Sequence, residues 1–578
     1  SVGDLANIID NGSTVTDVDN TTSTNTGTTS TSVTTATNIT VSDDNIDGKF
    51  SLVDESGNTL SATNKVYTIT TSGVYVASGK LSEGQIKVDV TDGEVEIDLE
   101  GVSISNSSVS PIYVVDASEV EIKAKNGTNN YVYDNRTTEY AGTTTDDGIG
   151  AIFSNNGDLK FTGKGSLYIH SYNNSGIHGK DNVKVKNLTL AIEADNNGIR
   201  GNDKITIEEN PTIDIYCGNN GLITSSTDMG SSAQHGYIYI NGGTILINSY
   251  GDAIDASYAV EIGTSTDSDG VTYSPVITAY TEVYSSYQYS SSSKSAPGGG
   301  MGGQGGPGGS GSNGFGPGGG TMGNSSSSDK ADESAKGIKA CESINITAGE
   351  IYLQTHDDGI HGNKTSDNTT ITFDNGDTSN GDVTISGGTI EIYASDDGVH
   401  ADGTLNIKGG YTEVTMSHEG IEGNIINMSG GTMVVDPAYN TNDEKGVSII
   451  TDDAVNASSQ INISGGYLDA AVNPNANDTD CIDSNGTYKQ TGGVVIARGP
   501  NQEMSSVLDC DGSISMSGGT FIGCGYVPSI SKSNMSSYSL SLASQGSHTV
   551  KINGTSYKFT NQYSYSGTTC YSSVSVTA

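Results

Sequence analysis

The sequence contains no tryptophan, and its only arginines are Arg136, Arg200 and Arg498. Basic residues of either kind are scarce, because 26 Lys and Arg stand against 68 Asp and Glu, which gives a formal charge of −42. A chain this acidic argues against nucleic acid and anionic membranes as direct partners. Its carboxylates must repel one another or hold cations, and a divalent cation holds them together most readily. We therefore expect calcium as the cofactor.

Long hydrophobic runs are also absent. No apolar segment reaches the roughly 18 residues of a membrane span, so we expect no membrane insertion. The chain begins at Ser1 without an initiator Met or a basic stretch followed by an apolar run, as a mature secreted product would. The expected location is extracellular or on the cell surface. Six cysteines are too few and too scattered for a disulfide scaffold or a zinc cluster.

Two segments have low complexity. Residues 1–40 are rich in Ser and Thr, and residues 286–330 hold a Tyr/Ser run followed by a Gly-rich run. These compositions are typical of flexible arms and insertions. The first segment also carries Val15, Val18 and Val33, so it could serve as a strand donated to another copy of the chain.

The rest of the chain repeats with a period of about 22 residues. The turn around Gly176 recurs at Gly198, and the turn around Gly398 recurs at Gly420. After each turn come short alternating strands and then a Gly-Gly corner, such as Gly409-Gly410. A unit this short cannot bury its own apolar face, whereas stacked units bury a continuous Ile/Val/Leu column. The repeat therefore predicts an all-β fold, a parallel β-helix.

Particular runs of residues also carry a family resemblance. Ser72-Gly73-Val74-Tyr75-Val76, Leu99-Glu100-Gly101-Val102 and the run Ser395 to Gly403 (SDDGVHADG) resemble the clostridial carbohydrate-binding β-helix proteins, which were first catalogued as a domain of unknown function. The resemblance covers about residues 48–525. It implies a right-handed parallel β-helix with bound calcium. It also implies plant cell-wall polysaccharides, including acidic pectin-like sugars, as ligands.

The expected domain organisation has four parts. Residues 1–40 form the N-terminal arm, and 41–125 form an N-terminal β cap with the opening coils. Residues 126–525 form the right-handed solenoid of about 22 residues per coil, with the Gly-rich insertion 286–330, and 526–578 form a C-terminal β cap.

Carboxylates recur at the turns, where equivalent residues of successive coils stand roughly 4.8 Å apart. At that distance a calcium ion between two carboxylates finds oxygen ligands on both sides, and magnesium fits less well. An alternative is that Asp and Asn serve only as turn residues before Gly. We favour that alternative for Asn174 and Asn197. The predicted calcium ligands are Asp357, Asp358, Asp396, Asp397, Asp402, Glu419, Glu422, Asp452 and Asp453.

Other residue types add secondary expectations. His361 and His400 follow the turn glycine by two residues, and in oxygen-rich surroundings we expect them to form a hydrogen-bonding ladder beside calcium rather than a transition-metal site. Cys481 and Cys510 occupy matching turn positions, and they either form a disulfide or stay buried thiols. Most of the 30 tyrosines are expected to stack on one another along the coils.

Three classes of function fit these features. The one we favour is a secreted, non-catalytic, calcium-binding adhesin that binds an acidic polysaccharide. The second is a subunit of an extracellular filament, joined head-to-tail by its N-terminal arm. The third, a polysaccharide lyase or hydrolase, needs a base beside the metal or a carboxylate pair across a cleft. Lys339, Lys364 and Lys408 are not repeated with the turns, so we do not expect an enzyme.

Overall fold

The computed structural model is all-β. It describes residues 42–137, 150–226, 234–281, 334–364, 379–435, 452–476 and 478–578, together with the short strands at 17–19, 228–229 and 372–373. Most of the predicted arm 1–40 and the whole of the insertion 286–330 lie outside these residues. Within the described ranges there is no helix, and therefore no helical membrane span.

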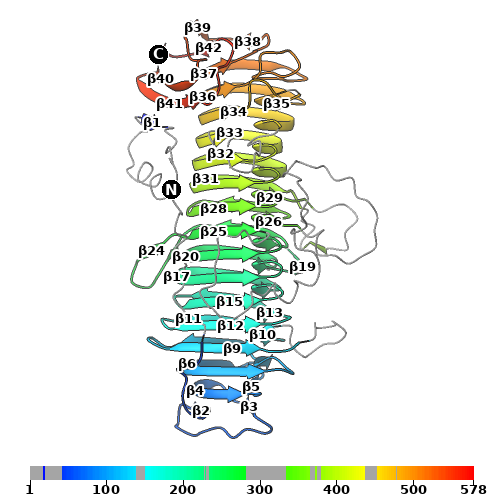
Figure 1. The fold of residues 1–578 in the computed structure, drawn as a ribbon, viewed down its shortest axis with the longest axis vertical. Coiled ribbons are helices and arrows are strands. Elements are labelled where there is room, and N and C mark those ends of the chain that lie inside the picture. Colours follow the sequence, from blue (N-terminus) through cyan, green and yellow to red (C-terminus); the bar gives the residue numbers. More distant parts are fainter. Residues whose placement is uncertain are drawn as a thin grey trace, which may run out of the picture.

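Most strands pair in parallel with a strand one coil away, and the pairs build three ladders along the long axis of the molecule (Figure 1). The first ladder contains β3 (Val66–Ile69), β5 (Gln85–Asp89), β7 (Ile112–Asp116), β10 (Gly150–Ser154), β13 (Ser175–Gly179), β16 (Ile199–Gly201), β18 (Leu222–Ile223), β21 (Ile254–Ala256), β26 (Ile338–Ala340), β29 (Ile360–Gly362), the starts of β32 (Val399–Met416), β33 (Ile421–Val435) and β34 (Val455–Ala471), and β35 (Ile482–Ser484).

The second and third ladders share several long strands that bend at a corner. These shared strands are β4 (Gly73–Ser82), β6 (Glu94–Asn106), β17 (Lys204–Cys217), β20 (Tyr237–Ser249), β31 (Asp382–Ala394), β36 (Thr487–Arg498) and β37 (Ile514–Cys524), with β32, β33 and β34. The second ladder adds β8 (Glu119–Ala124), β11 (Asp158–Gly163), β14 (Asn182–Lys186), β22 (Ala259–Ile262), β27 (Ser343–Ile346) and β38 (Ser531–Lys532). The third adds β9 (Asn129–Asp134), β12 (Ser166–Ser171), β15 (Thr189–Ala194), β25 (Val276–Thr281) and β28 (Glu350–Thr355).

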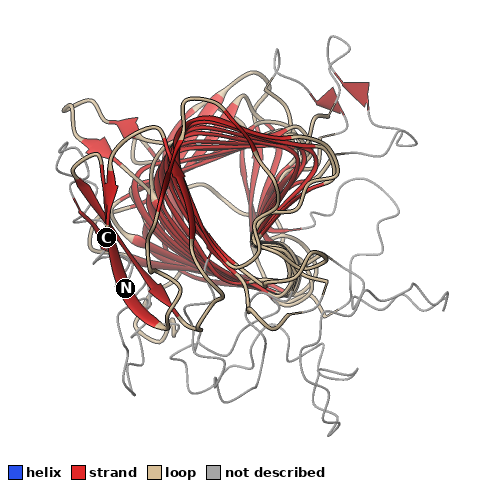
Figure 2. Cartoon of the chain, turned by 90° about the horizontal axis from the view of Figure 1, so that it is seen from above, coloured by secondary structure: helices blue, strands red, loops and turns tan. Residues whose placement is uncertain are grey.

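Alternation of apolar and polar residues explains why these segments are strands with one buried face. β8 reads Glu-Val-Glu-Ile-Lys-Ala, and its second, fourth and sixth side chains are buried. Stacking in register then gathers like residues into columns. Seen from above, the strands enclose one apolar interior (Figure 2). Burial of this continuous core is the main source of stability.

The Gly-Gly corners let long strands turn between ladders. Gly410 has a φ of +77°, which L side chains rarely adopt, and a Cβ there would lie 2.7 Å from the carbonyl carbon of Gly387. Glycine is therefore required by both the backbone conformation and the close approach of the neighbouring coil.

Antiparallel strands close both ends of the stack. β2 (Ser51–Asp54) pairs with β4, and β42 (Thr569–Ser572) pairs with β37 and β39 (Ser536–Tyr538). A separate sheet has the order β1 (Asp17–Asp19), β41 (Thr555–Asn561), β40 (Gly546–Ile552) and β43 (Val576–Thr577). Small pairs form between β23 (Ser265–Thr266) and β24 (Thr272–Tyr273), and between β19 (Asp228–Met229) and β30 (Thr372–Phe373).

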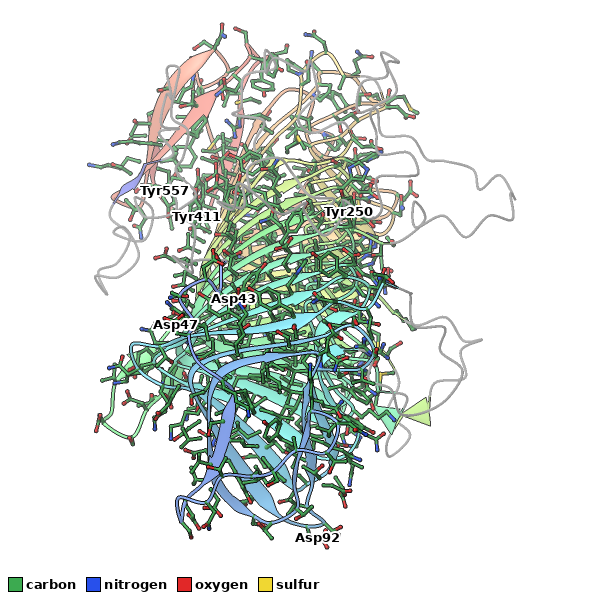
Figure 3. All side chains as sticks on the ribbon, turned by 60° about the horizontal axis from the view of Figure 1, so that its bottom comes forward. Asp43, Asp47, Asp92, Tyr250, Tyr411 and Tyr557 are labelled. Atoms are coloured by element: carbon green, nitrogen blue, oxygen red, sulfur yellow. The ribbon has the colours of Figure 1, made fainter. Side chains whose placement is uncertain are left out.

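The segment before β2 runs along the outside of the ladders, where Figure 3 labels Asp43 and Asp47. Asp43 accepts a hydrogen bond of 2.6 Å from the Ser103 hydroxyl and lies 3.0 Å from Lys80 Nζ. These contacts fix the segment to β4 and β6.

The predicted fold class, a right-handed parallel β-helix (solenoid) of about 22 residues per coil with an N-terminal arm and β caps, is wrong and is corrected here. Residues paired between neighbouring coils are 22 apart at Ser175 and Asn197, but 39 apart at Asp358 and Asp397 and 84 apart at Glu261 and Asn345. The antiparallel end strands belong to the same 35-stranded sheet as the parallel ones. The fold is an all-β stack of parallel ladders around a closed interior, with coils of unequal length.

Candidate functional site

A column of aliphatic residues positions the site on the first ladder. Each turn glycine is followed by a buried Ile, Leu or Val, which pairs in register with its equivalents one coil away. The residue after it points outward and forms what we call the outer row. Over the coils of interest the outer row consists of Asp255, Lys339, His361, His400, Glu422, Asn456 and Asp483.

The residue before each turn glycine, or before the alanine or cysteine in its place, forms a second line, the turn row. It consists of Asp252, Lys336, Asp358, Asp397, Glu419, Asp453 and Asp480. The glycines are needed because the coils pack closely here. A Cβ at Gly359 would lie 2.6 Å from the carbonyl oxygen of Gly398. The two rows therefore lie side by side and bring polar groups of many coils together.

In several turn-row carboxylates, one oxygen accepts a hydrogen bond from a backbone amide of the next coil. Asp358 Oδ1 accepts from the amide of Asp397 at 3.0 Å, Asp397 Oδ1 from the amide of Glu419 at 3.1 Å, and Asp453 Oδ1 from the amide of Asp480 at 2.6 Å. These bonds link one coil to the next, as a structural role for the turn residues requires. Asn197 does the same for Asn220, at 3.1 Å.

At the N-terminal end of the predicted cluster, a lysine neutralises the carboxylates. Lys336 Nζ lies 2.7 Å from Asp357 Oδ1 and 2.6 Å from Asp358 Oδ2. Asp358 is only 2% exposed. Burial alone would raise its pKa, but the contact with His361 and the charge of Lys336 hold the pKa of Asp358 well below its usual range. The group formed by Asp357, Asp358 and Asp396 thus already contains a cation.

The two predicted histidines occupy the middle of the cluster. The rings of His361 and His400 stack with centroids 4.3 Å apart. His400 Nδ1 lies 3.0 Å from both Asp397 and Glu422, and its Nε2 lies 3.2 Å from Asp402. Burial would lower the pKa of His400, but these three carboxylates raise it to about 12. His400 is therefore a fixed imidazolium among acidic groups.

At the C-terminal end, Glu419 and Asp453 have no such cationic side chain among their contacts in the described structure. Burial and the charges of Asp397 and Glu422 raise the pKa of Glu419 to about 9. Burial, with Asp452 nearby, raises the pKa of Asp453 to about 8. Asp397 is intermediate, because burial raises its pKa to about 6 even though His400 lies 3.0 Å away. Ionising this group without a cation is costly, so it is the part of the row that favours a bound divalent ion.

The geometry of this end suits a cation. One ligand atom from each of His418, Glu419 and Asp452 lies within 4.8 Å of the others. The two oxygens of Glu419 each lie 3.1 Å from Asn456 Nδ2. The carboxylates here come from the turns before β33 and β34, whose register is fixed by the pairing of Ile421 with Val455.

The structure thus brings all nine predicted carboxylates to one face. Their partners differ along it, from Lys336 at the N-terminal end through the two histidines to Asn456 at the C-terminal end. Sequence reasoning missed Lys336, Asn456 and His418. Lys336 stands at the turn-row position in the repeat, so the repeat could have revealed it. The partners of the other two become evident only when the register of long coils is known.

Other expectations have definite outcomes. Cys481 and Cys510 do not form a disulfide. The prediction that their positions match is wrong, because the amide of Cys481 pairs with the carbonyl of Ser506 instead. Among the described residues, some tyrosines meet along the coils as expected, and the ring of Tyr352 lies 5.9 Å from that of Tyr280 and 5.7 Å from that of Tyr393, with the rings tilted rather than parallel.

The class that fold and site define is an all-β protein of stacked parallel ladders with an acidic polar face. The chain belongs to the family of carbohydrate-binding domain-containing proteins, whose family model matches residues 63–379 and 364–423. The matched region includes Asp397 and Glu419 but ends before Asp452.

Two relatives illustrate the similarity. A carbohydrate-binding domain-containing protein of Acetivibrio thermocellus is 31% identical over 226 residues, which are 39% of this chain and 73% of that protein. A solved structure described as a polysaccharide lyase-like protein from C. thermocellum, in a gadolinium derivative, is 30% identical. The match covers 39% of this chain and 85% of that one, with a TM-score of 0.34.

Proposed function

We propose that this protein is a non-catalytic, extracellular carbohydrate-binding protein that holds calcium at the C-terminal end of its acidic rows. The observation that carries the proposal is the pair of carboxylates Glu419 and Asp453, whose pKa values are raised by burial and by neighbouring carboxylates, in a chain of a carbohydrate-binding family. A calcium ion there would take carboxylate oxygens from successive coils. Its remaining coordination positions could accept the carboxylate or hydroxyl oxygens of an acidic polysaccharide.

The charge state of nearby groups supports binding rather than catalysis. A lyase needs a base that can accept a proton. His400 is held protonated by three carboxylates, and Lys336 is paired with Asp357 and Asp358, where burial opposes but their charges raise its pKa. Lys339 Nζ likewise lies 3.3 Å from Asp252. Within the described rows, these basic groups are therefore poor proton acceptors at neutral pH.

The test compares the wild type with Asp397→Asn combined with Glu419→Gln. Calcium affinity is measured by titration calorimetry, and polygalacturonate binding is measured with calcium and with excess EGTA. The proposal expects the variant to lose calcium affinity and calcium-dependent glycan binding together. A matched control, Asp47→Asn with Glu55→Gln, removes the same charge from exposed positions and should behave as wild type. Equal calcium binding by both variants would refute the site.

A second function, assembly into a filament, is supported by one observation. β1 of the N-terminal arm pairs in parallel with β41, with Val18 opposite Tyr557 (Figure 3). Without β1, β41 would be an exposed sheet edge, which readily accepts a strand. We propose that the arm of a neighbouring copy takes this place, which would join copies head-to-tail.

Deletion of residues 1–40 tests this second function. Light scattering should show high-mass species for the full chain and only monomer for the truncated one. Assembly that is unchanged by the deletion would refute the arm as the joint. Calcium binding should not change, so the test is independent of the first proposal.

A further inference from the structure

A lysine-lined groove lies on the second ladder, away from the acidic rows. It has a volume of about 560 Å³ and lies over β8, β11 and β14. Its cationic lining residues are Lys123, Lys125, Lys160, Lys164 and Lys186. The acidic lining residues are Glu121 and Glu209. Lysine is thus enriched along this lining in a chain with 68 acidic and only 26 basic residues, and Glu96, Asp98 and Glu208 lie close by as ion-pair partners of these lysines.

Ladder register explains why the lysines gather here. Glu121 pairs with Lys160, and Lys160 pairs with Lys184 on the next strand. Lys123 stands two residues after Glu121 and so points to the same outer face. Adjacent strands are roughly 4.8 Å apart, so three coils place several ammonium groups within one short strip.

Most of these lysines form ion pairs with carboxylates, and their side chains remain partly exposed to solvent. Lys123 Nζ lies 2.9 Å from Glu96, Lys125 Nζ 2.8 Å from Asp98, and Lys160 Nζ 2.7 Å from Glu121. Partly exposed pairs of this kind contribute little to stability, about 0–1 kcal/mol each. An ammonium has three N–H donors, so one carboxylate partner leaves donors for a ligand. The pairs can therefore accept or exchange a carboxylate at small cost.

Lys164 differs from its neighbours. It is exposed at the corner after Gly163, and it forms no ion pair with any residue that the structure describes. Gly163 has a φ of +102°, and a Cβ there would lie 2.0 Å from the carbonyl oxygen of Ala124. The tight corner holds Lys164 at the groove.

The walls of the groove are held in place without a ligand. The hairpin β23/β24 contributes Ser268, and Ser265 fixes the hairpin to the ladder by accepting from the amide of Glu209 at 2.8 Å and donating to the carbonyl of Asn241 at 2.6 Å. Asp267 closes the hairpin by accepting from the Tyr273 hydroxyl at 2.7 Å. A preformed groove loses less entropy on binding than a flexible surface does.

We infer that this groove is a second glycan site, which binds the carboxylate groups of an acidic polysaccharide directly through lysine and without a metal ion. The lysines supply donors to the sugar carboxylates, and Glu121 and Glu209 supply acceptors for sugar hydroxyls. This mixture of donors and acceptors suits a chain that carries both carboxylates and hydroxyls. The inference rests on the proposed glycan binding but not on calcium.

The test measures binding of a defined oligogalacturonate to the full chain in excess EGTA. The variant Lys125→Gln, Lys164→Gln, Lys186→Gln is compared with Lys408→Gln, Lys489→Gln, Lys551→Gln, which removes the same charge from exposed positions elsewhere. We expect the groove variant to raise Kd by about tenfold or more, which corresponds to about 1.4 kcal/mol, and the control to match wild type. The fully methyl-esterified oligosaccharide should bind weakly to all three proteins.

The outcomes separate this inference from the proposed function. Binding by wild type only when calcium is present, or equal binding by the groove variant and wild type in EGTA, overturns the lysine site and leaves the calcium site standing. An equal loss in the control variant also overturns it, because general charge would then explain the effect. Binding that survives EGTA and depends on the groove lysines supports the inference, even if the variant at Asp397 and Glu419 binds normally. Circular dichroism of each variant checks that the fold is intact.

Discussion

Replacing Glu419 with glutamine should stabilise the metal-free protein and weaken its response to calcium. Glu419 lies in the turn row, and in the described structure its oxygens are in contact with Asn456 rather than with a cationic side chain. Its carboxylate is therefore costly to ionise until a cation binds. Glutamine has nearly the same shape, keeps an oxygen for Asn456, and cannot ionise.

The magnitude follows from the pKa. Burial and nearby carboxylates raise the pKa of Glu419 from an ordinary 4.5 to about 9. Between these values the folded state binds the proton more tightly than the unfolded state, so the stability of the wild type falls as the pH rises through this window. At about 1.4 kcal/mol per pH unit, the cost at pH 7 is about 3 kcal/mol. Allowing for weakened contact with Asn456, we expect a net gain of about 2 kcal/mol for the variant.

Thermal unfolding in EGTA measures this effect. For a chain of this length, 2 kcal/mol corresponds to a rise of about 2 °C in Tm. The difference between Glu419→Gln and wild type should be small at pH 4.5 and grow toward pH 8. Added calcium should raise Tm more for wild type than for the variant, because only wild type gains a charged ligand. A variant that melts below wild type in EGTA at pH 8, or a difference independent of pH, would refute the reasoning.

Three further predictions concern the fold. Burial lowers the pKa of His178 from 6.5 to about 3, so between these values the unfolded state binds more protons and stability falls as the pH drops. His178→Asn should therefore flatten the dependence of Tm on pH in this window. An unchanged slope would contradict the assignment. Gly410→Ala should lower the free energy of unfolding in urea by about 2–4 kcal/mol, because of backbone strain and a clash. Gly57→Ala, where φ is also positive but the space is open, should lower it by only about 1 kcal/mol. Equal losses of stability would exclude the clash. Arg498 is 0% exposed and pairs with Asp469, so Arg498→Met should destabilise the fold by about 3–5 kcal/mol by leaving a buried carboxylate unpaired. Adding Asp469→Leu should recover most of this loss of stability. If it recovers none, the loss comes from packing.

The local rules of the fold could be predicted from the sequence because they depend on neighbouring residues. The buried residue after each turn glycine and the left-handed second glycine of each corner follow from alternation and from backbone sterics, and Gly410 and Gly431 adopt φ values of +77° and +74°. Coil length could not be predicted in the same way. A loop of any length can leave a turn and return to the same ladder at little cost, so a long coil leaves no periodic signal. The 84-residue separation of Glu261 and Asn345 spans the insertion 286–330, which composition and not periodicity predicted. The pairing of β42 with β37 depends equally on distant residues.

The number of carboxylates at the turns does not by itself decide where calcium binds. Asp358 and Glu419 occupy the same position in the repeat, so the sequence alone predicts calcium for both. The structure separates them by what the neighbouring coil supplies. Lys336 precedes Asp358 by one coil and provides a permanent cation, whereas Asp453 follows Glu419 and adds another carboxylate. Since the ammonium of Lys336 already meets Asp358, a calcium ion would have to displace it there, but at Glu419 it would displace only a proton. Calcium should therefore bind first at the C-terminal end of the row.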